Sequence, residues 1–292
     1  MSKKHIVINS FVPALLFLMA FTTPAERPLK TITPDKLQQD GAATSICSIS
    51  NRAFGHGETI TYKLYYNWNF VWVAAGEVTF KVRELDDSYH LSAIGTTYNS
   101  YEWFYKVRDR YDTYVDKKTL LPRTSIRDIL EGKYTLYDKT SFDQNARRAY
   151  TRRAKTKDQE LELTEHPLNG CMHDIMSMIY YTRNMDFNRY RKGERIPIKI
   201  FMDKEVWPLS MTYHGQDDNF KVKGLGRFDA IHLSPELVAG EIFEEGAEMN
   251  IWVSDDENRI PLLIESPLSV GSVKAVLKDY SGLRHELTSA HD

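Results

Sequence analysis

The chain has 292 residues, of which 42% are hydrophobic, 27% charged and 12% aromatic, and its formal net charge is −2. This composition is typical of a globular protein and excludes disorder of the whole chain. The charge balance argues against a general nucleic-acid binder, which carries a strong basic excess. The aromatic content, with 17 tyrosines, favours β-sheet because flat rings pack well on pleated surfaces.

The N-terminal segment has the layout of a cleavable secretory signal peptide. A basic start at residues 3–5 precedes an apolar run over residues 6–21, and the small residue Ala25 closes the segment. These are the parts of such a signal, whereas a membrane span needs roughly 20 apolar residues. We therefore expect residues 1–25 to be removed and a soluble periplasmic protein without a transmembrane span to remain. The first cysteine is Cys47, so no lipid anchor is expected at the cleavage point.

The remaining chain divides into an arm, a β-rich domain and a tail. Residues 26–54 are rich in proline and small polar residues with little periodicity, as in an extended arm. Residues 55–285 carry the strand patterns, and residues 286–292 form a short C-terminal tail. A helix separates two blocks of predicted strands, so an alternative division has two halves that meet near residue 165.

Period-two alternation of apolar and polar residues predicts most of the strands. In chain order they cover residues 60–66, 72–82, 89–93, 107–115, 123–130, 133–142 and 146–155, then 196–202, 206–215, 220–225, 249–254, 260–266 and 272–279. Residues 100–106 fit either a short helix or a crossover. The expected fold class is mainly β, with an antiparallel curved sheet or an incomplete β-barrel.

One inserted helix is predicted over about residues 171–184. Spacings of three and four place five residues on one face, apolar for the first four: Met172, Ile175, Met176, Ile179 and Arg183. Asn169 is the expected N-cap, and Asp174 lies in the first turn, where negative charge is favoured.

The two cysteines, Cys47 and Cys171, are disulfide candidates in an oxidising compartment. The bridge would tie the arm to the middle of the chain. The alternative is two separate buried thiols, because sequence does not show whether two sites lie within bonding distance.

No motif identifies a catalytic or metal centre. His166, His173 and Asp174 supply suitable ligand types, but their spacing matches no strong metal signature. The chain has no Gly-x-Ser-x-Gly elbow. Cys171 and His173 are two residues apart on the predicted helix and point in different directions. We therefore predict no catalytic residues, no metal and no cofactor, and favour a protein that is not an enzyme.

Two residue groups suggest ligand binding. Residues 146–157 carry six basic side chains and no acid, namely Arg147, Arg148, Arg152, Arg153, Lys155 and Lys157. Arginine forks suit phosphate and carboxylate groups, although such runs are more often solvated strand edges. An acidic stretch over residues 236–257 lacks basic residues.

The second group is aromatic and comprises Trp68, Phe70, Trp72, Tyr101, Trp103, Phe104 and Tyr105. Large side chains on a concave sheet can hold an acyl chain or stack on a sugar, although more often they form core. From both groups, the candidate ligand-binding residues are Trp72, Trp103, Tyr105, Arg147, Arg152 and Arg153.

Short motifs along the chain resemble the bacterial domain of unknown function 3108 family. They are Gly57-Glu58 followed by Tyr62, Ala75-Gly76-Glu77-Val78, Val107-Arg108-Asp109-Arg110 with Asp116, Leu121-Pro122 before Glu131-Gly132, Phe142-Asp143, and Arg259-Ile260-Pro261 ahead of Gly271. The resemblance covers about residues 55–285, and its specificity lies in the order of the motifs. The family has no assigned activity, so no site residue is carried over.

The resemblance implies an exported, mostly antiparallel β protein. By analogy of fold, its expected curved sheet and inserted helix look like the half-barrel lipoprotein carriers of the bacterial envelope. Fold alone does not fix function. The first functional hypothesis is a periplasmic protein that binds a lipid, glycolipid or other amphipathic envelope component on a concave sheet. The alternatives are an assembly factor that binds another envelope protein, and a hydrolase that acts on glycans or lipids.

Overall fold

The computed structural model describes residues 49–68, 71–103, 105–238, 246–268 and 271–291. The predicted signal peptide, most of the arm and Cys47 lie outside these ranges, as do Phe70 and Phe104. No helix in the described ranges is long and apolar enough to cross a membrane.

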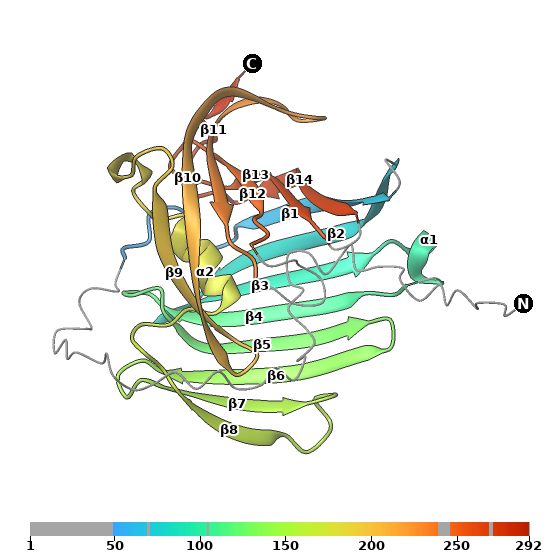
Figure 1. Cartoon of the computed structure of the whole chain (residues 1–292), viewed down its shortest axis with the longest axis vertical. Helices are drawn as coiled ribbons and strands as arrows, with labels where there is room; N and C mark the ends of the chain where they lie inside the picture. The colour runs from blue at the N-terminus through green and yellow to red at the C-terminus, as the bar shows by residue number, and fades with distance from the viewer. Residues whose placement is uncertain (1–48, 69–70, 104, 239–245, 269–270, 292) are drawn as a thin grey trace, which may run out of the picture.

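One antiparallel sheet of 15 strands dominates the structure (Figure 1). Its first eight strands are β1 (Thr59–Trp68), β2 (Val71–Glu84), β3 (Ser88–Thr97), β4 (Arg108–Asp116), β5 (Pro122–Glu131), β6 (Tyr134–Asp143), β7 (Arg148–Ala154) and β8 (Glu162–Pro167). The others are β9 (Arg195–Met202), β10 (Glu205–Val222), β11 (Gly226–Pro235), β12 (Asn250–Ser254), β13 (Pro261–Pro267), β14 (Ser272–Ser281) and β15 (Ala290–His291).

The sheet consists of two meanders joined at their ends: the first meander is β1–β8 and the second is β9–β14. The strand order is β8-β7-β6-β5-β4-β3-β2-β1-β14-β13-β12-β11-β10-β9, and β15 pairs with β11 outside this path. The join is the antiparallel pairing of β1 with β14. The path leaves β8 and β9 at its two ends, so the curved sheet does not close into a complete barrel. The predicted mainly β class is confirmed.

Alternating burial explains why these segments form strands. In β2, Val78, Phe80 and Val82 are buried, whereas Lys81 and Arg83 between and after them are exposed. Such alternation places one face of a strand against the core and the other toward solvent. Register shifts in β1 next to Tyr62 and Leu64 mark irregularities, which increase local bending and twist.

Some strands differ from the sequence prediction. Strands β8 and β11 are not among the predicted elements, and β10 is one strand of 18 residues where two were predicted. In β11, the buried residues include Ala230, Ile231 and Leu233, which belong to both faces. A strand covered on both faces loses the clean alternation that identifies a half-exposed strand.

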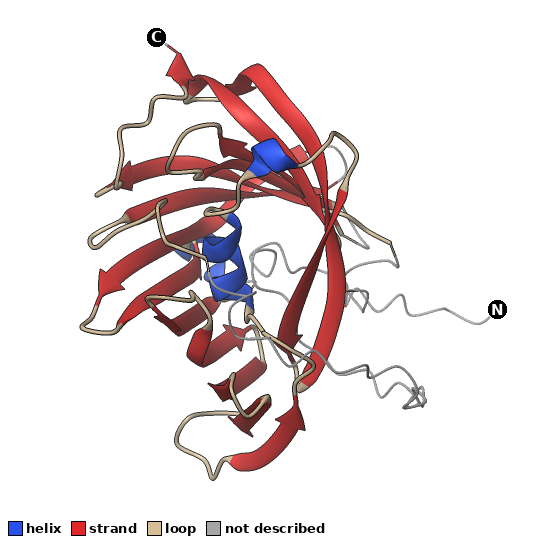
Figure 2. Ribbon diagram, turned by 90° about the vertical axis from the view of Figure 1, so that its left-hand side faces the viewer, coloured by secondary structure: helices blue, strands red, loops and turns tan. Residues whose placement is uncertain are grey.

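The inserted helix α2 (Ile175–Thr182) lies on the concave side of the sheet (Figure 2). Its N-cap is Asp174, whose side chain accepts from Ser177 N–H while the Ser177 hydroxyl bonds Asp174 N–H. The prediction of Asn169 as N-cap is therefore wrong, because this reciprocal capping box starts the helix later. Thr113 of β4 also donates to the Asp174 carboxylate at 2.5 Å, which fastens the helix start to the sheet.

Two shorter helical turns complete the fold. The single turn α1 (Asn99–Glu102) follows β3, in agreement with one of the two interpretations of residues 100–106. The 3-10 turn η2 (Phe187–Arg189) follows α2 and packs Phe187 against the second meander.

Candidate ligand pocket

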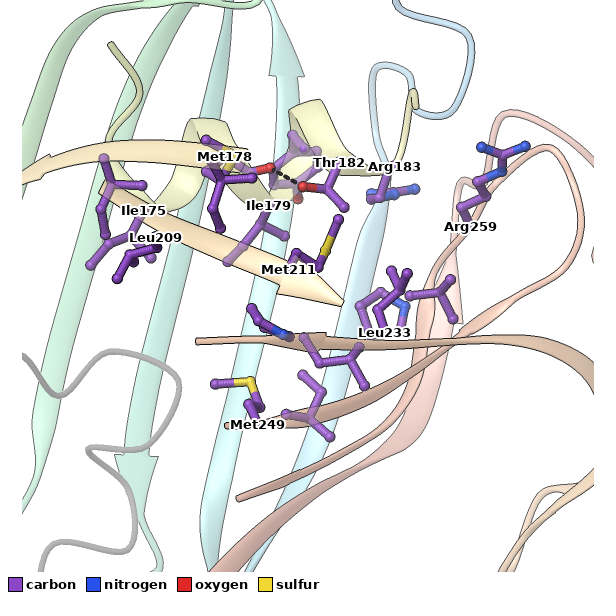
Figure 3. Close-up of a pocket in the computed structure, with 18 of the residues that line it drawn as sticks. Ile175, Met178, Ile179, Thr182, Arg183, Leu209, Met211, Leu233, Met249 and Arg259 are labelled. Carbon is purple, nitrogen blue, oxygen red and sulfur yellow. Dashed lines mark hydrogen bonds between the residues drawn. The ribbon is translucent and has the colours of Figure 1, made fainter. Parts of the chain in front are cut away.

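A pocket of about 180 Å³ lies between α2 and the strands of the second meander (Figure 3). Its walls are mainly aliphatic and thioether side chains, including Ile175, Met178, Ile179, Ile198, Ile200, Leu209, Met211, Leu233, Met249, Ile251 and Ile264. An apolar cavity of roughly 150 Å³ is already large enough to stay dry and bind a small hydrocarbon. The pocket therefore has the size and lining of a site for an apolar group.

Helix α2 supplies one wall because it is apolar on more than one face. Met176 and Tyr180 are buried, and both belong to the main core of the sheet. Ile175, Met178 and Ile179 line the pocket (Figure 3). A helix that is hydrophobic around most of its circumference needs apolar neighbours on several sides. The pocket is where its second face meets β9–β13.

Arg183, at the C-terminal end of α2, lines the pocket, but its donors are already used. Its Nη1 and Nη2 donate to the two carboxylate oxygens of Glu58 at 2.6 and 2.8 Å. Its Nε donates to the carbonyl of Asn258 at 3.0 Å. Both charged side chains are buried. Arg183 therefore positions the helix and does not offer a free charge to a ligand.

Arg259 is the other guanidinium at the pocket, on the loop between β12 and β13 (Figure 3). It is partly exposed and lies over the Phe187 ring, 5.3 Å from the centroid. Within the described part of the chain, its side chain forms no ion pair or hydrogen bond. A guanidinium with unused donors beside an apolar pocket can bind a carboxylate or phosphate group.

Glu236 places a negative charge at the pocket, but protein groups already bind its carboxylate. Its carboxylate accepts from the backbone N–H of Ser210 at 2.8 Å and pairs with Arg195. Desolvation opposes ionisation, but hydrogen bonds from Ser210 and Arg195 outweigh it and lower the pKa of Glu236. Among the charged residues that line the pocket, Arg259 alone keeps its side-chain donors available.

The predicted aromatic ligand residues lie away from the pocket. Trp72 is exposed, and the Lys274 ammonium lies 3.9 Å from its ring centroid. Trp103 is highly exposed and follows α1, whereas Tyr105 packs partly buried against the core. Trp72 belongs to the β1–β2 hairpin, and Trp103 and Tyr105 follow α1; Figure 1 shows these two elements at the same end of the sheet, and none of the three residues lines the pocket. Their role in binding stays a prediction.

The predicted basic ligand residues lie on or next to β7. Arg147 and Arg152 are exposed. The Arg153 guanidinium donates to Asp138 and, at 2.8 Å, to Asp203. The structure therefore places Arg153 in an ion network between β6–β7 and the β9–β10 turn. None of the three lines the pocket, and their contact with a ligand stays a prediction.

Arg127 completes this ion network. It donates to Asp138 at 2.9 Å and to Asp203 at 2.6 Å. Two arginines and two aspartates thus share their charges across the concave side. Because Asp203 belongs to the turn of the second meander, the network connects the two meanders away from their β1–β14 join.

The histidines considered as metal ligands have other partners. His173 is buried, and its Nδ1 lies 3.0 Å from the Ser177 hydroxyl. Burial lowers the pKa of His173 to about 3, so it is neutral at physiological pH. His166 lies 3.0 Å from the Thr151 hydroxyl. No group of three or more metal-ligating side chains occurs within the described residues.

The structure contains no free cysteine among the residues that it describes. Cys171 falls in the segment before α2, and Cys47 lies outside the described ranges. The pairing of Cys47 with Cys171 stays a prediction.

A second buried titratable feature is the carboxyl pair of Asp109 and Glu131. Asp109 on β4 and Glu131 at the end of β5 are only 2% and 4% exposed, and their side chains share a hydrogen bond. Desolvation raises the pKa of both groups, and the neighbouring Asp109 raises that of Glu131 further. The fold therefore favours a protonated carboxyl in this pair.

Sequence reasoning did not identify the pocket, although two signals for it were present. The apolar residues of α2 extend beyond one face, with Met178 outside the predicted stripe. Arg259 belongs to a motif that carries the family resemblance. Because the pocket joins segments far apart in the chain, neither signal could be assigned to it without the strand order.

The comparisons with known proteins agree with this architecture. A similar solved structure is a β-barrel-like protein with a domain of unknown function, DUF1849, from Brucella abortus. Its TM-score is 0.54 at 10% identity, over 79% of this chain and 98% of that chain. At this identity the likeness is one of fold alone. No curated protein matches the chain in sequence.

The sequence profile of the DUF3108 family, described as a protein of unknown function, matches residues 61–278. This match spans every strand from β2 to β13 and most of β1 and β14. The chain therefore belongs to the DUF3108 family.

Proposed function

We propose that this protein is an exported periplasmic binding protein that takes up a lipid-like, amphipathic molecule. The pocket between α2 and β9–β13 would hold the apolar part, and Arg259 would contact an anionic head group. The observation that carries this proposal is an aliphatic pocket of about 180 Å³ with a guanidinium at its side whose donors are unused.

The lining favours hydrocarbon over a polar solute. Binding sites for small molecules combine apolar walls with a few polar groups that fix orientation. Here, Glu236 and Arg183 are engaged by protein partners, so a polar solute would meet few unused donors or acceptors. An acyl chain or a comparable apolar group gains from the transfer out of water, at roughly 25 cal/mol for each Å² of apolar surface that is buried.

The predicted signal peptide supports an envelope location, where such molecules occur in bacteria. An arginine at the pocket suits the phosphate or carboxylate of an anionic amphiphile. Arg147, Arg152 and Arg153 remain the alternative head-group contacts that the sequence suggests. These alternatives differ in position, because Arg259 lines the pocket whereas the others lie on or next to β7.

A fluorescent polyene fatty acid provides the direct test. Met178→Trp places a larger side chain in the pocket from a half-buried position on α2. We expect saturable binding to the unmodified protein and a loss of affinity of about tenfold or more in the variant. Ile94→Trp adds the same side chain at an exposed position on β3 outside the pocket, and should bind normally.

Circular dichroism and thermal unfolding would establish that both variants are folded. Equal binding by the unmodified protein and Met178→Trp would contradict the proposal, as would the absence of binding to the unmodified protein.

A further inference from the structure

We propose that one end of the sheet docks on the surface of a bilayer that contains anionic lipid. We call this surface the aromatic end, and define it by Val71, Trp72, Tyr101, Trp103, Lys106 and Lys133. None of these residues lines the pocket. The membrane contact therefore does not depend on the proposed function or on an occupant of the pocket.

The strand registers bring these residues to one end of the sheet. Val71 and Trp72 begin β2 at the tip of the β1–β2 hairpin. Strand β3 runs antiparallel to β2 and ends at Thr97 opposite Gly76, in the half of β2 that leads to the tip, and α1 follows it. The backbone N–H of Gly132 in the β5–β6 turn donates to the carbonyl of Lys106, so Lys133 lies at this end as well. Figure 1 shows the β1–β2 hairpin, α1 and the β5–β6 turn at the same end.

Large hydrophobic side chains are concentrated here. Trp103 is 84% exposed and Val71 is 60% exposed, and Trp72 and Tyr101 are also exposed. Ile94, Leu163 and Tyr280 are the other large hydrophobics exposed on the described surface, and they are scattered over β3, β8 and β14. Single exposed hydrophobics are ordinary, whereas a cluster of them marks an interaction surface.

The charge of the aromatic end is complementary to anionic lipid. Lys106 and Lys133 are exposed, and neither forms a salt bridge with another described residue. The acidic Glu102 of α1 is paired with Arg108. Glu131, next to the β5–β6 turn, is buried and has a raised pKa. The lysines therefore dominate the charge that this end presents to solvent.

The residue types favour a bilayer surface over an aqueous partner. Tryptophan and tyrosine concentrate at membrane–water interfaces, where their amphipathic rings sit at the head-group level. The Trp103 indole donates to the Ser100 carbonyl at 3.0 Å while the residue stays exposed. Lysines close to an anionic membrane surface add attraction that salt screens. The aromatic end carries exposed tryptophan and tyrosine rings together with exposed lysines, as expected for a surface that contacts anionic head groups.

The test uses protein recovered from a bacterial periplasm, with its N-terminus defined by mass spectrometry, and flotation with phospholipid vesicles. One vesicle type is phosphatidylcholine, and the other also contains phosphatidylglycerol. We expect flotation with the anionic vesicles, reduced by salt, and much weaker flotation with the neutral ones. Trp103→Ser should lower the partition coefficient by about fivefold or more. Lys106→Glu with Lys133→Glu should lower it by at least about fivefold for each lysine, because each substitution removes an attraction and adds a repulsion.

Matched control variants distinguish docking through the aromatic end from nonspecific adsorption to vesicles. Leu163→Ser removes an exposed hydrophobic on β8, and Lys118→Glu reverses an exposed charge in the β4–β5 turn at the opposite end of the sheet. Both should float like the unmodified protein. Lipids brominated near the head group should quench tryptophan fluorescence less in Trp103→Phe than in the unmodified protein.

The absence of flotation with both vesicle types would overturn the proposal. An equal loss of flotation in the control variants would overturn it as well. The fatty-acid binding assay measures ligand binding in the pocket independently of flotation. Loss of flotation with retained fatty-acid binding would therefore reject the membrane contact and leave the proposed function standing.

Discussion

The guanidinium of Arg183 and the carboxylate of Glu58 form a buried bidentate pair, with N–O distances of 2.6 and 2.8 Å. Arg183 caps the C-terminal end of α2, and Glu58 directly precedes β1. The same guanidinium bonds the carbonyl of Asn258, the residue before Arg259. One side chain therefore connects the helix wall of the pocket, the first strand and the loop that carries the proposed head-group contact.

Glu58→Gln should be strongly destabilising. The substitution leaves a buried arginine without its counter-charge, and breaking a buried pair in this way typically costs about 3–5 kcal/mol. Urea unfolding would measure this loss in the free energy of unfolding. Glu160→Gln, at an exposed position without an ion pair in the described structure, should change stability by less than about 0.5 kcal/mol. Similar stabilities of the two variants would show that the pair does not hold the helix.

Stability should fall as pH rises, in part because of Asp109 and Glu131. Burial raises the pKa of both carboxyls, so the folded state keeps protons that the unfolded chain releases above about pH 4. Stabilisation by the protonated pair is complete below that pH. It is lost as pH rises toward the raised pKa values that the two carboxyls have in the folded state. The slope is about 1.4 kcal/mol per pH unit for each proton that differs between the two states.

Glu131→Gln should flatten this pH dependence. It removes the titrating group whose pKa is raised by burial and by the neighbouring Asp109. Urea unfolding at several pH values between mildly acidic and alkaline conditions would compare the variant with the unmodified protein and with Glu160→Gln. Parallel profiles for all three would mean that the pair does not contribute to the pH dependence.

Arg259→Met should weaken binding of an anionic amphiphile more than binding of a neutral one with the same chain. A hydrogen bond to a charged group contributes about 1.5–3 kcal/mol, which corresponds to a loss of roughly tenfold or more. Isothermal titration calorimetry with a fatty acid and its alcohol would measure both affinities. Arg152→Met removes an exposed arginine of β7 that the sequence also suggests. A larger effect of Arg152→Met would show that the head group binds at β7 and not at Arg259.

Cys47 and Cys171 should form a disulfide in the exported protein. Peptide mapping without reduction is expected to recover the two cysteines in one cross-linked fragment that reduction separates. Closure of so long a loop stabilises a fold by roughly 4–5 kcal/mol in the chain-entropy account. Alkylation of both thiols in unreduced, unfolded protein would exclude the bridge.

The sequence predicted those parts of the fold that have one buried and one exposed face. Strands such as β2 and β6 show clear alternation, and the helix around Met176 was recognised from its spacing. The strand β11 was missed because Ala230, Ile231 and Leu233 are buried on both of its faces. The start of α2 was misplaced because Asp174 acts as the cap itself and not as a first-turn charge.

The candidate site was harder to predict than the fold. Met178 and Arg259 meet at one pocket only because the second meander folds back over α2. Arg153, chosen for its charge, is instead bound by Asp138 and Asp203. The partner of a charge is set by tertiary pairing across many residues, which a local pattern does not contain.

Native mass spectrometry of the protein purified from a bacterial periplasm is the most direct test of a lipid-like cargo in the pocket. We expect a bound species in stoichiometric amount that organic extraction releases as a lipid or glycolipid. This species should be lost in Met178→Trp but retained in Ile94→Trp. A protein that stays empty after incubation with total envelope lipids, or one that retains its cargo in Met178→Trp, would contradict the proposed function.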